Sequence, residues 1–529
     1  MKRTSGKNLI KSSAALLLAA SMLAGCGGGA AASGNSGAAS GAADSNAPVA
    51  LTVHDIYGTD VADFTAPVAV KLQEATNVTL TNTVSSSSTD EEQAWTLMIS
   101  NPDSMPDIVV ASDMSRIEKL GLDGGLIPLE DLIEEKCPNI VAAFEAYPVL
   151  RTASTASDGH IYQIAGMKEM SIANTWIIRQ DWLDKLGLET PTTTDELYEV
   201  LKAFRTEDPN GNGVQDETPL MTRWLSAPDN FTEHGLSLFN SSNGLMVRQG
   251  KVVFDPMEED FKVGMKSLIQ WYSEGLIDPE VYTRDDACNA LYGNNLAGLT
   301  FDWSASTTQY NVSLAETIPG FNNVVMAPVQ APNGRTVVDH RSVPFAGAGI
   351  TQNCANVDAA LRLLDYLYSE EGQVLMTYGI EGETYTVDAD GNYQFTEEML
   401  KYDGGLTVAR KEWGCLLHLG GVEPVELEYA VATNDATLAG YELYMAHPEW
   451  YPEDEYYGFN FKYTTEEAEE INVLLPSLKD YVNEKCMSWI LGNGNFEAEY
   501  DNFVAELKAR NVDRVIEISQ NAYDRLKGK

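Results

Sequence analysis

Apolar and polar positions alternate with two different periods along the chain, and the periods predict short strands followed by helices. The expected elements of the first part follow in this order: a strand at residues 49–54, a helix at 64–76, a strand at 77–80, a helix from Thr89 to Ile99, a strand at 106–110 and a helix at 113–120. Strands that alternate with helices in this way are typical of a parallel, doubly wound sheet. The pattern therefore predicts an α/β fold.

The same pattern continues to the end of the chain, without an internal repeat. The later elements are expected in this order: a strand at 159–164, a strand leading into a helix at 176–188 that Gly187 stops, a helix opening at 191–197 with Thr194 as its N-cap, a helix at 268–275, a helix at 361–368 that continues through 372–378, and two amphipathic helices at 498–526. A chain of 529 residues is too long for one core, so two or three lobes are expected.

The first 25 residues have the layout of a secretory signal peptide. Four basic residues precede an apolar run at 14–20, which is too short to span a bilayer stably. Leu23, Ala24 and Gly25 then lead into Cys26, which is the lipobox pattern of bacterial lipoproteins. In such proteins the peptidase needs a small residue before the cysteine, and the thiol is acylated. The sequence therefore predicts lipidation of Cys26; the simpler alternative is an ordinary signal peptide that contains a cysteine.

The segment after this cysteine is almost entirely Gly, Ala, Ser and Asn. Such a composition cannot bury a core, so residues 26–48 are expected to form a lipidated, flexible tether. By random-coil scaling, about twenty such residues span roughly 25 Å. The predicted location is the extracytoplasmic face of the cell membrane, with the protein attached through its lipid.

The formal net charge of −43 at pH 7 restricts the partners. Phosphate repulsion argues against nucleic acid, and docking on anionic lipid is disfavoured, so the acyl chain must provide the anchoring. Solubility is the simplest reason for such a charge. Besides Cys26 the chain has five cysteines, widely spaced and without a CxxC motif, which fits neither a disulfide framework nor a zinc site. A single bridge stays open.

Several segments together resemble one family of proteins. They are the lipobox at 23–26 and the segments 105–108, 158–162, 179–187, 275–279 and 378–385. In their order and spacing they are similar to family 1 extracellular solute-binding proteins, in particular the lipoprotein branch tied to oligosaccharide ABC importers. The resemblance covers nearly the whole chain after the tether. It implies a type II periplasmic-binding fold, in which two hinge-linked lobes with mostly parallel, doubly wound sheets hold a sugar in a cleft.

The resemblance also implies how the chain is divided and with what it interacts. The first lobe is expected to comprise residues 49–170 and 335–380, and the second 171–334 and 381–529. The expected partners are an oligosaccharide and the permease subunits of an ABC importer. We expect a monomer that presents its ligand unchanged, so no catalytic residue is assigned.

Residues 208–217 form the sharpest local motif, because oxygen-bearing side chains alternate there before a glycine. Calcium needs six to eight hard oxygen ligands, and this spacing can wrap them around one point. The candidate ligands of a structural calcium ion are Asp208, Asn210, Asn212, Val214 through its carbonyl, Asp216 and Glu217. The motif departs from the EF-hand, because position twelve is Pro219 and Glu217 must close the site. Alginate-binding members of the resembling family carry a similar loop; the simpler alternative is a solvated Asx–Gly turn.

Sugars are bound by aromatic rings and by planar polar side chains. Trp182, Trp271 and Trp489 lie on amphipathic helices, where core packing is expected. The candidate ligand contacts lie instead near loops or strand ends: Trp176, Trp224, Asp302, Trp303, Arg341 and Trp413. Asp302 and Trp303 follow a predicted strand, where a doubly wound lobe presents its ligand groups. For each residue taken singly, a structural role is as well supported as a binding role.

Three other classes of protein remain as alternatives. They are a tethered exoenzyme of the glycosidase type, a peptide-binding lipoprotein of the same architecture, and a surface or adhesion lipoprotein. A glycosidase pair of carboxylates is defined by its separation in space, so sequence does not exclude it. The chain contains no G-x-S-x-G, H-E-x-x-H or P-loop motif, and its six histidines are scattered. The sequence therefore favours a binding protein over an enzyme.

Overall fold

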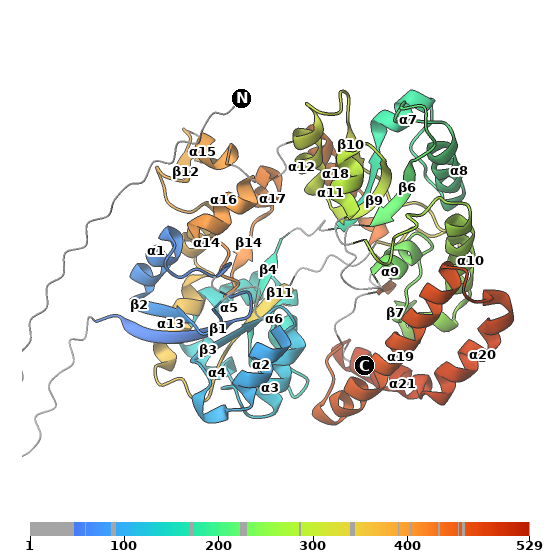
Figure 1. Ribbon diagram of the computed structural model, residues 1–529. Helices are drawn as coiled ribbons and strands as arrows, with labels where there is room; N and C mark the ends of the chain where they lie inside the picture. Colours follow the sequence, from blue (N-terminus) through green and yellow to red (C-terminus); the bar gives the residue numbers. More distant parts are fainter. Residues whose placement is uncertain are drawn as a thin grey trace, which may run out of the picture. The chain divides into compact units, whose positions relative to one another are not determined.

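A six-stranded sheet organises the first lobe of the computed structural model (Figure 1). Its strands are β1 (Val49–Asp55), β2 (Val78–Asn82), β3 (Ile108–Ala111), β4 (Ile164–Lys168), β11 (Pro344–Ile350) and β14 (Val422–Glu423), in the order β14-β4-β11-β3-β1-β2. β1 runs parallel to β2 and β3, whereas β11 is antiparallel to β3 and β4. The mostly parallel, doubly wound sheet expected from the sequence is confirmed for this lobe.

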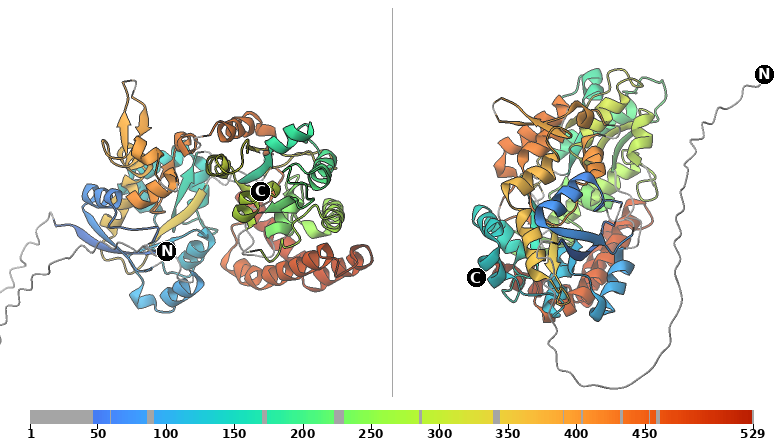
Figure 2. Two further views of the ribbon diagram at one scale, coloured as in Figure 1. Left: turned by 45° about the horizontal axis from the view of Figure 1, so that its top comes forward. Right: turned by 90° about the vertical axis from the view of Figure 1, so that its left-hand side faces the viewer.

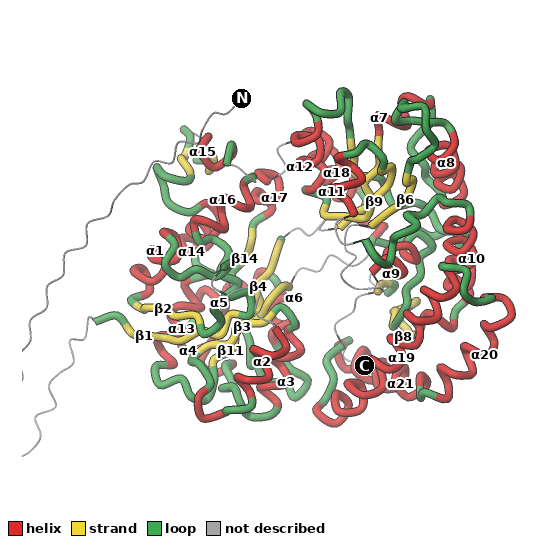
Figure 3. Tube along the Cα trace, viewed as in Figure 1, coloured by secondary structure: helices red, strands yellow, loops and turns green. Residues whose placement is uncertain are grey.

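Helices cover both faces of this sheet (Figure 3). They are α1 (Pro67–Thr76), α2 (Glu91–Ile99), α3 (Met114–Leu122), α4 (Glu130–Lys136), α5 (Pro138–Ala146), α6 (Pro148–Ser154), α13 (Val357–Tyr366) and α14 (Glu370–Tyr378), with a short 3₁₀ turn η1 (Pro102–Ser104). Successive residues of a strand face opposite sides. Ile108 and Val110 accordingly pack in the core with α1, α4, α5 and α13, and Val109 and Ala111 pack with α2 and α3.

The chain after α14 adds a smaller cluster to this lobe. It comprises β12 (Tyr385–Val387), β13 (Tyr393–Phe395), α15 (Glu397–Leu400), α16 (Leu406–Trp413) and α17 (Val425–Val431). The hairpin of β12 and β13 stands out from the helices beside it (Figure 2). β14 pairs with β4, and Leu417 and Leu419 join the first-lobe core. This pairing does not follow the predicted assignment of residues 381–529 to the second lobe, and the exact lobe boundaries stay a prediction.

The second lobe contains a four-stranded sheet in the order β10-β5-β9-β6. Its strands are β5 (Asn174–Arg179), β6 (Thr218–Thr222), β9 (Ala297–Trp303) and β10 (Asn323–Val325). β6 and β9 are parallel, but β5 is antiparallel to both β9 and β10. Strands β10, β9 and β6 therefore share one direction and β5 runs against them, as β11 does in the first sheet, so the expected mostly parallel arrangement is found here as well. A further small sheet joins β7 (Leu245–Arg248), β8 (Lys251–Phe254) and β15 (Tyr456–Tyr457).

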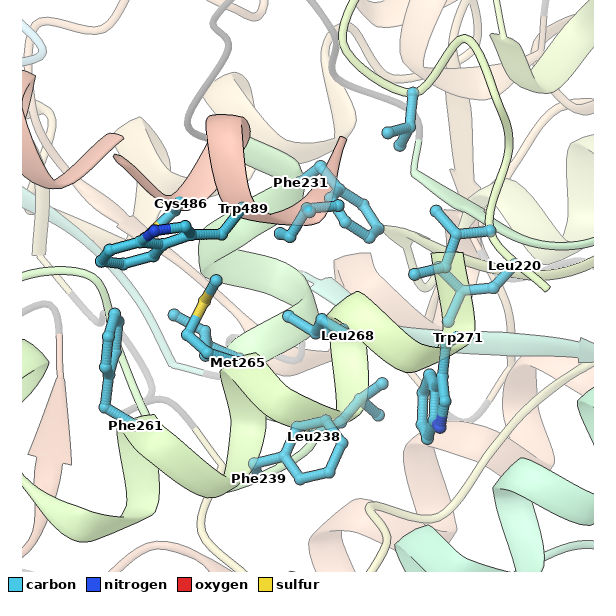
Figure 4. Packing of buried hydrophobic residues seen from close by; sticks show 14 of the residues in the cluster. Leu220, Phe231, Leu238, Phe239, Phe261, Met265, Leu268, Trp271, Cys486 and Trp489 are labelled. Atoms are coloured by element: carbon cyan, nitrogen blue, oxygen red, sulfur yellow. The ribbon is translucent and has the colours of Figure 1, made fainter. Parts of the chain in front are cut away.

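Helices surround the second sheet, and the last three lie together in the views of Figures 1 and 2. The helical elements are α7 (Gln180–Leu186), α8 (Thr194–Thr206), α9 (Asn230–Ser237), η2 (Asp255–Met257), α10 (Glu259–Ser273), α11 (Ala287–Gly293), α12 (Ser306–Leu314), α18 (Asp435–Ala446), η3 (Pro448–Trp450), α19 (Thr465–Ile490), α20 (Phe496–Ala509) and α21 (Val512–Leu526). Figure 4 shows Phe261, Met265 and Leu268 of α10 packed near Trp489 of α19. Since α10 and α19 are far apart in sequence, this core fixes the tertiary position of the C-terminal helices.

Three predicted elements differ from those observed. The strand expected at 159–164 lies later, as β4, because Gly159 adopts a left-handed φ of 90° in a turn. Thr193, not Thr194, caps α8, since Thr193 is extended and its side chain accepts a hydrogen bond from the Glu196 amide at 3.2 Å. Helices α13 and α14 are separate, because the Ser369 side chain caps the second one by accepting from the Gly372 amide.

The chain passes between the two lobes three times: between β4 and β5, between β10 and β11, and between β14 and α18. The structure describes residues 47–527, with the exception of residues 59, 86–90, 170–173, 223–229, 285–286, 339–343, 390, 403–404, 432–433, 453 and 458–460. Residues 48–529 belong to one unit by their contacts. More than one crossing is what the hinge-linked lobes of the sequence-based prediction require.

Candidate functional site

A pocket of about 780 Å³ is lined by residues of both lobes. The first lobe contributes Trp95 of α2 and polar residues of α3. The second lobe contributes residues 242–245 at the start of β7, Phe461, Tyr463 and one face of α19. Ligand pockets for small molecules commonly measure about 300–1,000 Å³. The size and the mixed origin of the walls suit a ligand that contacts both lobes at once.

The first-lobe wall follows directly from the end of strand β3. The apolar strand ends at Ala111, and Asp113 then caps α3 by accepting hydrogen bonds from the amide and the hydroxyl of Ser115, at 3.0 and 2.6 Å. Asp113, Ser115 and Arg116 line the pocket. The carboxyl ends of β1 and β3 lie at one edge, which is where open α/β sheets bind their ligands. Sequence reasoning identified this stretch as a helix and missed its place in the pocket.

His54 lies near the end of β1, behind the pocket-lining ring of Trp95. The imidazole is 4% exposed and meets Trp95 edge-on, with 6.1 Å between ring centroids. Its Nδ1 lies 3.1 Å from the Thr83 hydroxyl, while Nε2 is buried without a hydrogen-bond partner. Burial lowers the pKa of His54 to about 4, so the ring is neutral at physiological pH. A neutral imidazole has one donor and one acceptor nitrogen, so Nε2 of His54 can take part in one hydrogen bond with an uncharged polar group.

Asp55 at the end of β1 and Asn82 at the end of β2 form a polar pair next to His54 and Thr83. The Asp55 amide donates to Asn82 Oδ1 at 3.2 Å, and Asp55 Oδ1 accepts from the Tyr57 amide at 3.0 Å. Asp55 Oδ2 and Asn82 Nδ2 are buried without partners, and burial raises the pKa of Asp55 to about 7. Unsatisfied buried groups cost about 1–3 kcal/mol each. A polar residue directly after a buried strand was the sequence signal that could have pointed to this pair.

A buried ion pair joins the two lobes beside the pocket. Lys462 follows β15, and its ammonium group donates to Glu118 Oε2 of α3 at 2.9 Å and to the Ala153 carbonyl at 3.0 Å. The other Glu118 oxygen accepts from the Ser157 amide at 2.9 Å. The Lys462 carbonyl in turn accepts from Arg525 of α21. Lys462 therefore connects the first lobe to the C-terminal helices of the second, and sequence reasoning did not select it.

The predicted calcium loop is a compact turn after α8. Asp208 Oδ1 accepts from the amides of Gly211 and Asn212, at 2.9 and 3.0 Å, and Asp208 Oδ2 accepts from the Gly213 amide at 3.0 Å. Gly211 and Gly213 have φ values of 77° and 81°, which only glycine adopts freely. Asn212 Oδ1 accepts from the Val214 amide at 2.7 Å. The sequence motif thus brings its oxygen atoms together within one turn.

The surroundings of the Glu217 carboxylate indicate whether this loop suits a cation. Its side chain is 2% exposed, and both carboxylate oxygens are buried without a hydrogen-bond partner. Burial raises its pKa above the usual value, although the backbone amides of Glu217 and Asn210 act to lower it; the charges of Asp208 and Asp216 raise it further. Asp216 accepts from the amide groups of Asn210 and Asn212, at 3.2 and 3.0 Å. Carboxylate, amide and carbonyl oxygens are the ligands that calcium prefers, and an unpaired buried carboxylate fits such an ion. Within the described residues, no three His, Cys, Asp or Glu side chains are already placed as a metal group.

Comparison with known proteins identifies the family. The model of the bacterial extracellular solute-binding protein family matches residues 57–374, which is more than half of the chain. The chain is a bacterial extracellular solute-binding protein. Its fold is that of type II periplasmic binding proteins, in agreement with the strand order β2-β1-β3-β11-β4 of the first sheet.

Three relatives illustrate what this solute-binding protein is similar to. The fructooligosaccharide ABC transporter substrate-binding protein FusA of Streptococcus pneumoniae is 28% identical over 438 residues, which cover 76% of each chain. Lipoprotein LipO of Bacillus subtilis is 27% identical over 47% of this chain and 51% of its own. The crystal structure of the alginate-binding protein AlgQ2 without calcium ion is 29% identical, with a TM-score of 0.77, over 91% of this chain and 99% of the other. Two of these relatives, FusA and AlgQ2, are named as binding proteins.

The predicted sugar-binding residues of the solute-binding protein lie in different surroundings. Trp303, at the end of β9, is 45% exposed. Its neighbour Asp302 is fully buried and accepts hydrogen bonds from the Tyr310 hydroxyl at 2.9 Å and the Ser306 hydroxyl at 3.1 Å. Of this pair, Trp303 is exposed at the surface, while Asp302 is buried and its internal hydrogen bonds hold the end of β9. Their role in binding stays a prediction.

The other predicted aromatic contacts are more enclosed. Trp176 on β5 is 5% exposed and packs edge-on against Phe301, with 5.2 Å between ring centroids. Trp413 at the end of α16 packs against the small cluster around β12 and β13. Trp224 and Arg341 lie outside the described residues. The described residues that line the pocket of both lobes do not include Trp176, Asp302, Trp303 or Trp413.

The structure shows for four of the six cysteines whether they form disulfides. Cys137, Cys354, Cys415 and Cys486 are free and buried, so none of these four forms a bridge. Cys26 and its tether lie outside the described residues. Among the helices of the described part, none combines the length and the apolar character needed to cross a membrane.

Proposed function

We propose that this solute-binding protein captures an oligosaccharide outside the cytoplasm and delivers it to the permease of an ABC importer. The observation that carries the proposal is the pocket lined by both lobes, with Trp95 and polar residues of α3 on one side and α19 on the other. The substrate and the transporter are suggested by FusA, which matches three quarters of the chain. Serine, asparagine and aromatic side chains in the walls suit sugar hydroxyls and the apolar faces of sugar rings.

Binding is proposed to act through closure of the lobes. A ligand that contacts both walls stabilises the closed form selectively, and the hinge equilibrium shifts by that differential affinity. Lys462 and Glu118 keep the lobes in contact next to the pocket, so closure proceeds around an existing junction. The ligand leaves unchanged. ATP hydrolysis and translocation are assigned to other chains, and the protein acts as a monomer.

A thermal-shift screen of the purified protein against a panel of oligosaccharides tests the proposal. At least one member of the panel should raise the melting temperature, because a ligand that binds only the folded state stabilises it. Chromatography of the same samples should return the sugar intact. Absence of any stabilising carbohydrate would refute capture, and released product would favour the tethered glycosidase.

Calcium is proposed as a structural ligand of the loop at 208–217. The residues that would hold it are Asp208, Asn210, Asn212, the carbonyl of Val214, Asp216 and Glu217. The two unpartnered oxygens of Glu217 support this assignment, as does the reference to calcium in the structure of AlgQ2. When bound, the ion would neutralise a buried carboxylate and tie α8 to β6; it would take no part in sugar binding. Chelation should lower the melting temperature and added calcium should restore it.

The proposed location is the extracytoplasmic face of the cell membrane, to which an acyl chain on Cys26 would attach the protein. The lipobox at 23–26, the tether that follows and the similarity to LipO support this proposal. Incorporation of a labelled fatty acid by expressing cells tests it directly. The wild type should become labelled and partition into detergent, whereas Cys26→Ser should do neither. Equal labelling of the two proteins would contradict the assignment.

A further inference from the structure

The relatives leave the chemical class of the ligand open, because one is named for a neutral glycan and another for alginate, a chain of uronic acids. We infer that the pocket selects neutral oligosaccharides and disfavours uronates. This inference rests on the proposed function and deepens it. The charged side chains of the pocket and their partners carry the argument.

The basic residues in the first-lobe wall of the pocket lie close to carboxylates of the same wall. The Lys119 ammonium lies 2.9 Å from an oxygen of Asp123, and the Arg116 guanidinium lies 3.6 Å from Asp113. A uronate carboxylate that leaves water needs a cation or several hydrogen-bond donors, and a bidentate arginine is the strongest of these. Because Arg116 and Lys119 already face the carboxylates of Asp113 and Asp123, a uronate must compete with these side chains for each cation.

The second-lobe wall provides little to reverse this balance. Glu233 adds a further negative charge, and Lys479 is the basic side chain of the described lining that lies outside an ion pair. Glu118 of the lining is already paired with Lys462, so the wall as a whole carries no excess of positive charge that could attract an anion. A ligand that carries one negative charge on every sugar ring therefore finds few cations to pair with, within a protein of net charge −43.

The remaining polar groups suit hydroxyls. Ser115, Asn243 and Asn472 line the pocket, and hydroxyl groups can donate to or accept from such side chains. Phe461 and Tyr463 line the same pocket, with 5.8 Å between their ring centroids and an angle of 30° between their planes. Apolar sugar faces stack on aromatic rings of this kind. The lining thus offers uncharged contacts and few cations that are not already paired.

Titration calorimetry with neutral and uronic oligosaccharides of matched length tests the inference. Fructo-oligosaccharides serve as the neutral series, and oligogalacturonates and oligomannuronates as the charged series. The wild type should bind a neutral member at least tenfold more tightly than any uronate. The gap should narrow as salt screens the repulsion. Equal or tighter binding of a uronate would overturn the inference while leaving oligosaccharide capture intact, whereas binding of neither series would refute the proposed function.

Two charge variants locate the source of the selectivity. Asp123→Asn removes the carboxylate that faces Lys119, and should lower the ratio of neutral to uronate affinity about threefold, the size expected for an exposed ion pair. Glu397→Gln changes the net charge equally at the exposed Lys401–Glu397 pair of α15, and should leave the ratio at its wild-type value. A ratio that changes in Glu397→Gln but not in Asp123→Asn would assign the preference to the whole chain and overturn the role of the pocket.

Discussion

Replacing Glu217 by glutamine separates a calcium site from a plain turn. Glutamine keeps the shape of the side chain but removes the charge that a cation needs. Calcium at about 100 times its dissociation constant stabilises a folded protein by about 2.7 kcal/mol. With an unfolding entropy of about 2.1 cal/mol/K per residue, the unit at 48–529 unfolds with about 1 kcal/mol/K. The wild type should therefore melt about 3 °C higher in calcium than in chelator.

The glutamine variant should lose most of this shift. In chelator it should melt at or above the wild-type temperature, because both oxygens of the native carboxylate are buried without a partner. Glu199→Gln is the matched control: Glu199 is exposed on the neighbouring α8 and pairs with Lys202. It should respond to calcium as the wild type does. Differential scanning calorimetry measures all three proteins, and a full calcium shift in Glu217→Gln would refute the assignment.

Three further predictions follow from the described residues. Trp303→Ala tests the predicted sugar contact that lies outside the pocket of both lobes. It should weaken oligosaccharide binding about tenfold in calorimetric titrations without changing the melting temperature, since loss of an aromatic stack costs about 0.5–1.5 kcal/mol. Unchanged affinity would show that Trp303 does not contact the ligand. The pKa of His418 is lowered to about 4 by burial, so between pH 6.5 and 4 the unfolded chain binds a proton that the folded chain does not. The free energy of unfolding of the wild type should consequently fall between pH 7 and pH 5, and denaturant titration measures this fall. In His418→Asn the fall should be smaller by about 2 kcal/mol, because the proton uptake by the unfolded histidine is absent. The same fall in both proteins would contradict the lowered pKa. Lys462→Met leaves Glu118 buried without its cation and should cost about 3 kcal/mol in the same assay, whereas the double variant with Glu118→Leu should recover most of the loss; equal losses would contradict a coupled pair.

The parts of the fold that sequence predicts well are those with strong local signals. β1 alternates as far as Val53, Gly187 ends α7 in a left-handed conformation, and the two C-terminal helices have apolar faces. Sequence misses the break between α13 and α14 at Ser369, because both helices keep a similar apolar period. The antiparallel pairing of β5 depends on tertiary partners that the strand itself does not encode.

The candidate site is harder to predict, because its walls come from distant segments. Trp95 and Tyr463 line one pocket although more than half of the chain separates them. Sequence reasoning selected tryptophans near strand ends, and it could not distinguish the exposed Trp303 from the enclosed Trp176. By contrast, the ten-residue loop that ends at Glu217 is local. Its oxygen spacing and glycines were therefore visible in the sequence, as was the turn that they form.

The most direct test of reversible capture by a two-lobed clamp is an equilibrium titration of the purified protein with an oligosaccharide, followed by recovery of the ligand. The account predicts one saturable site per chain and release of the same sugar on denaturation. Binding without saturation, or recovery of a cleaved sugar, would contradict it.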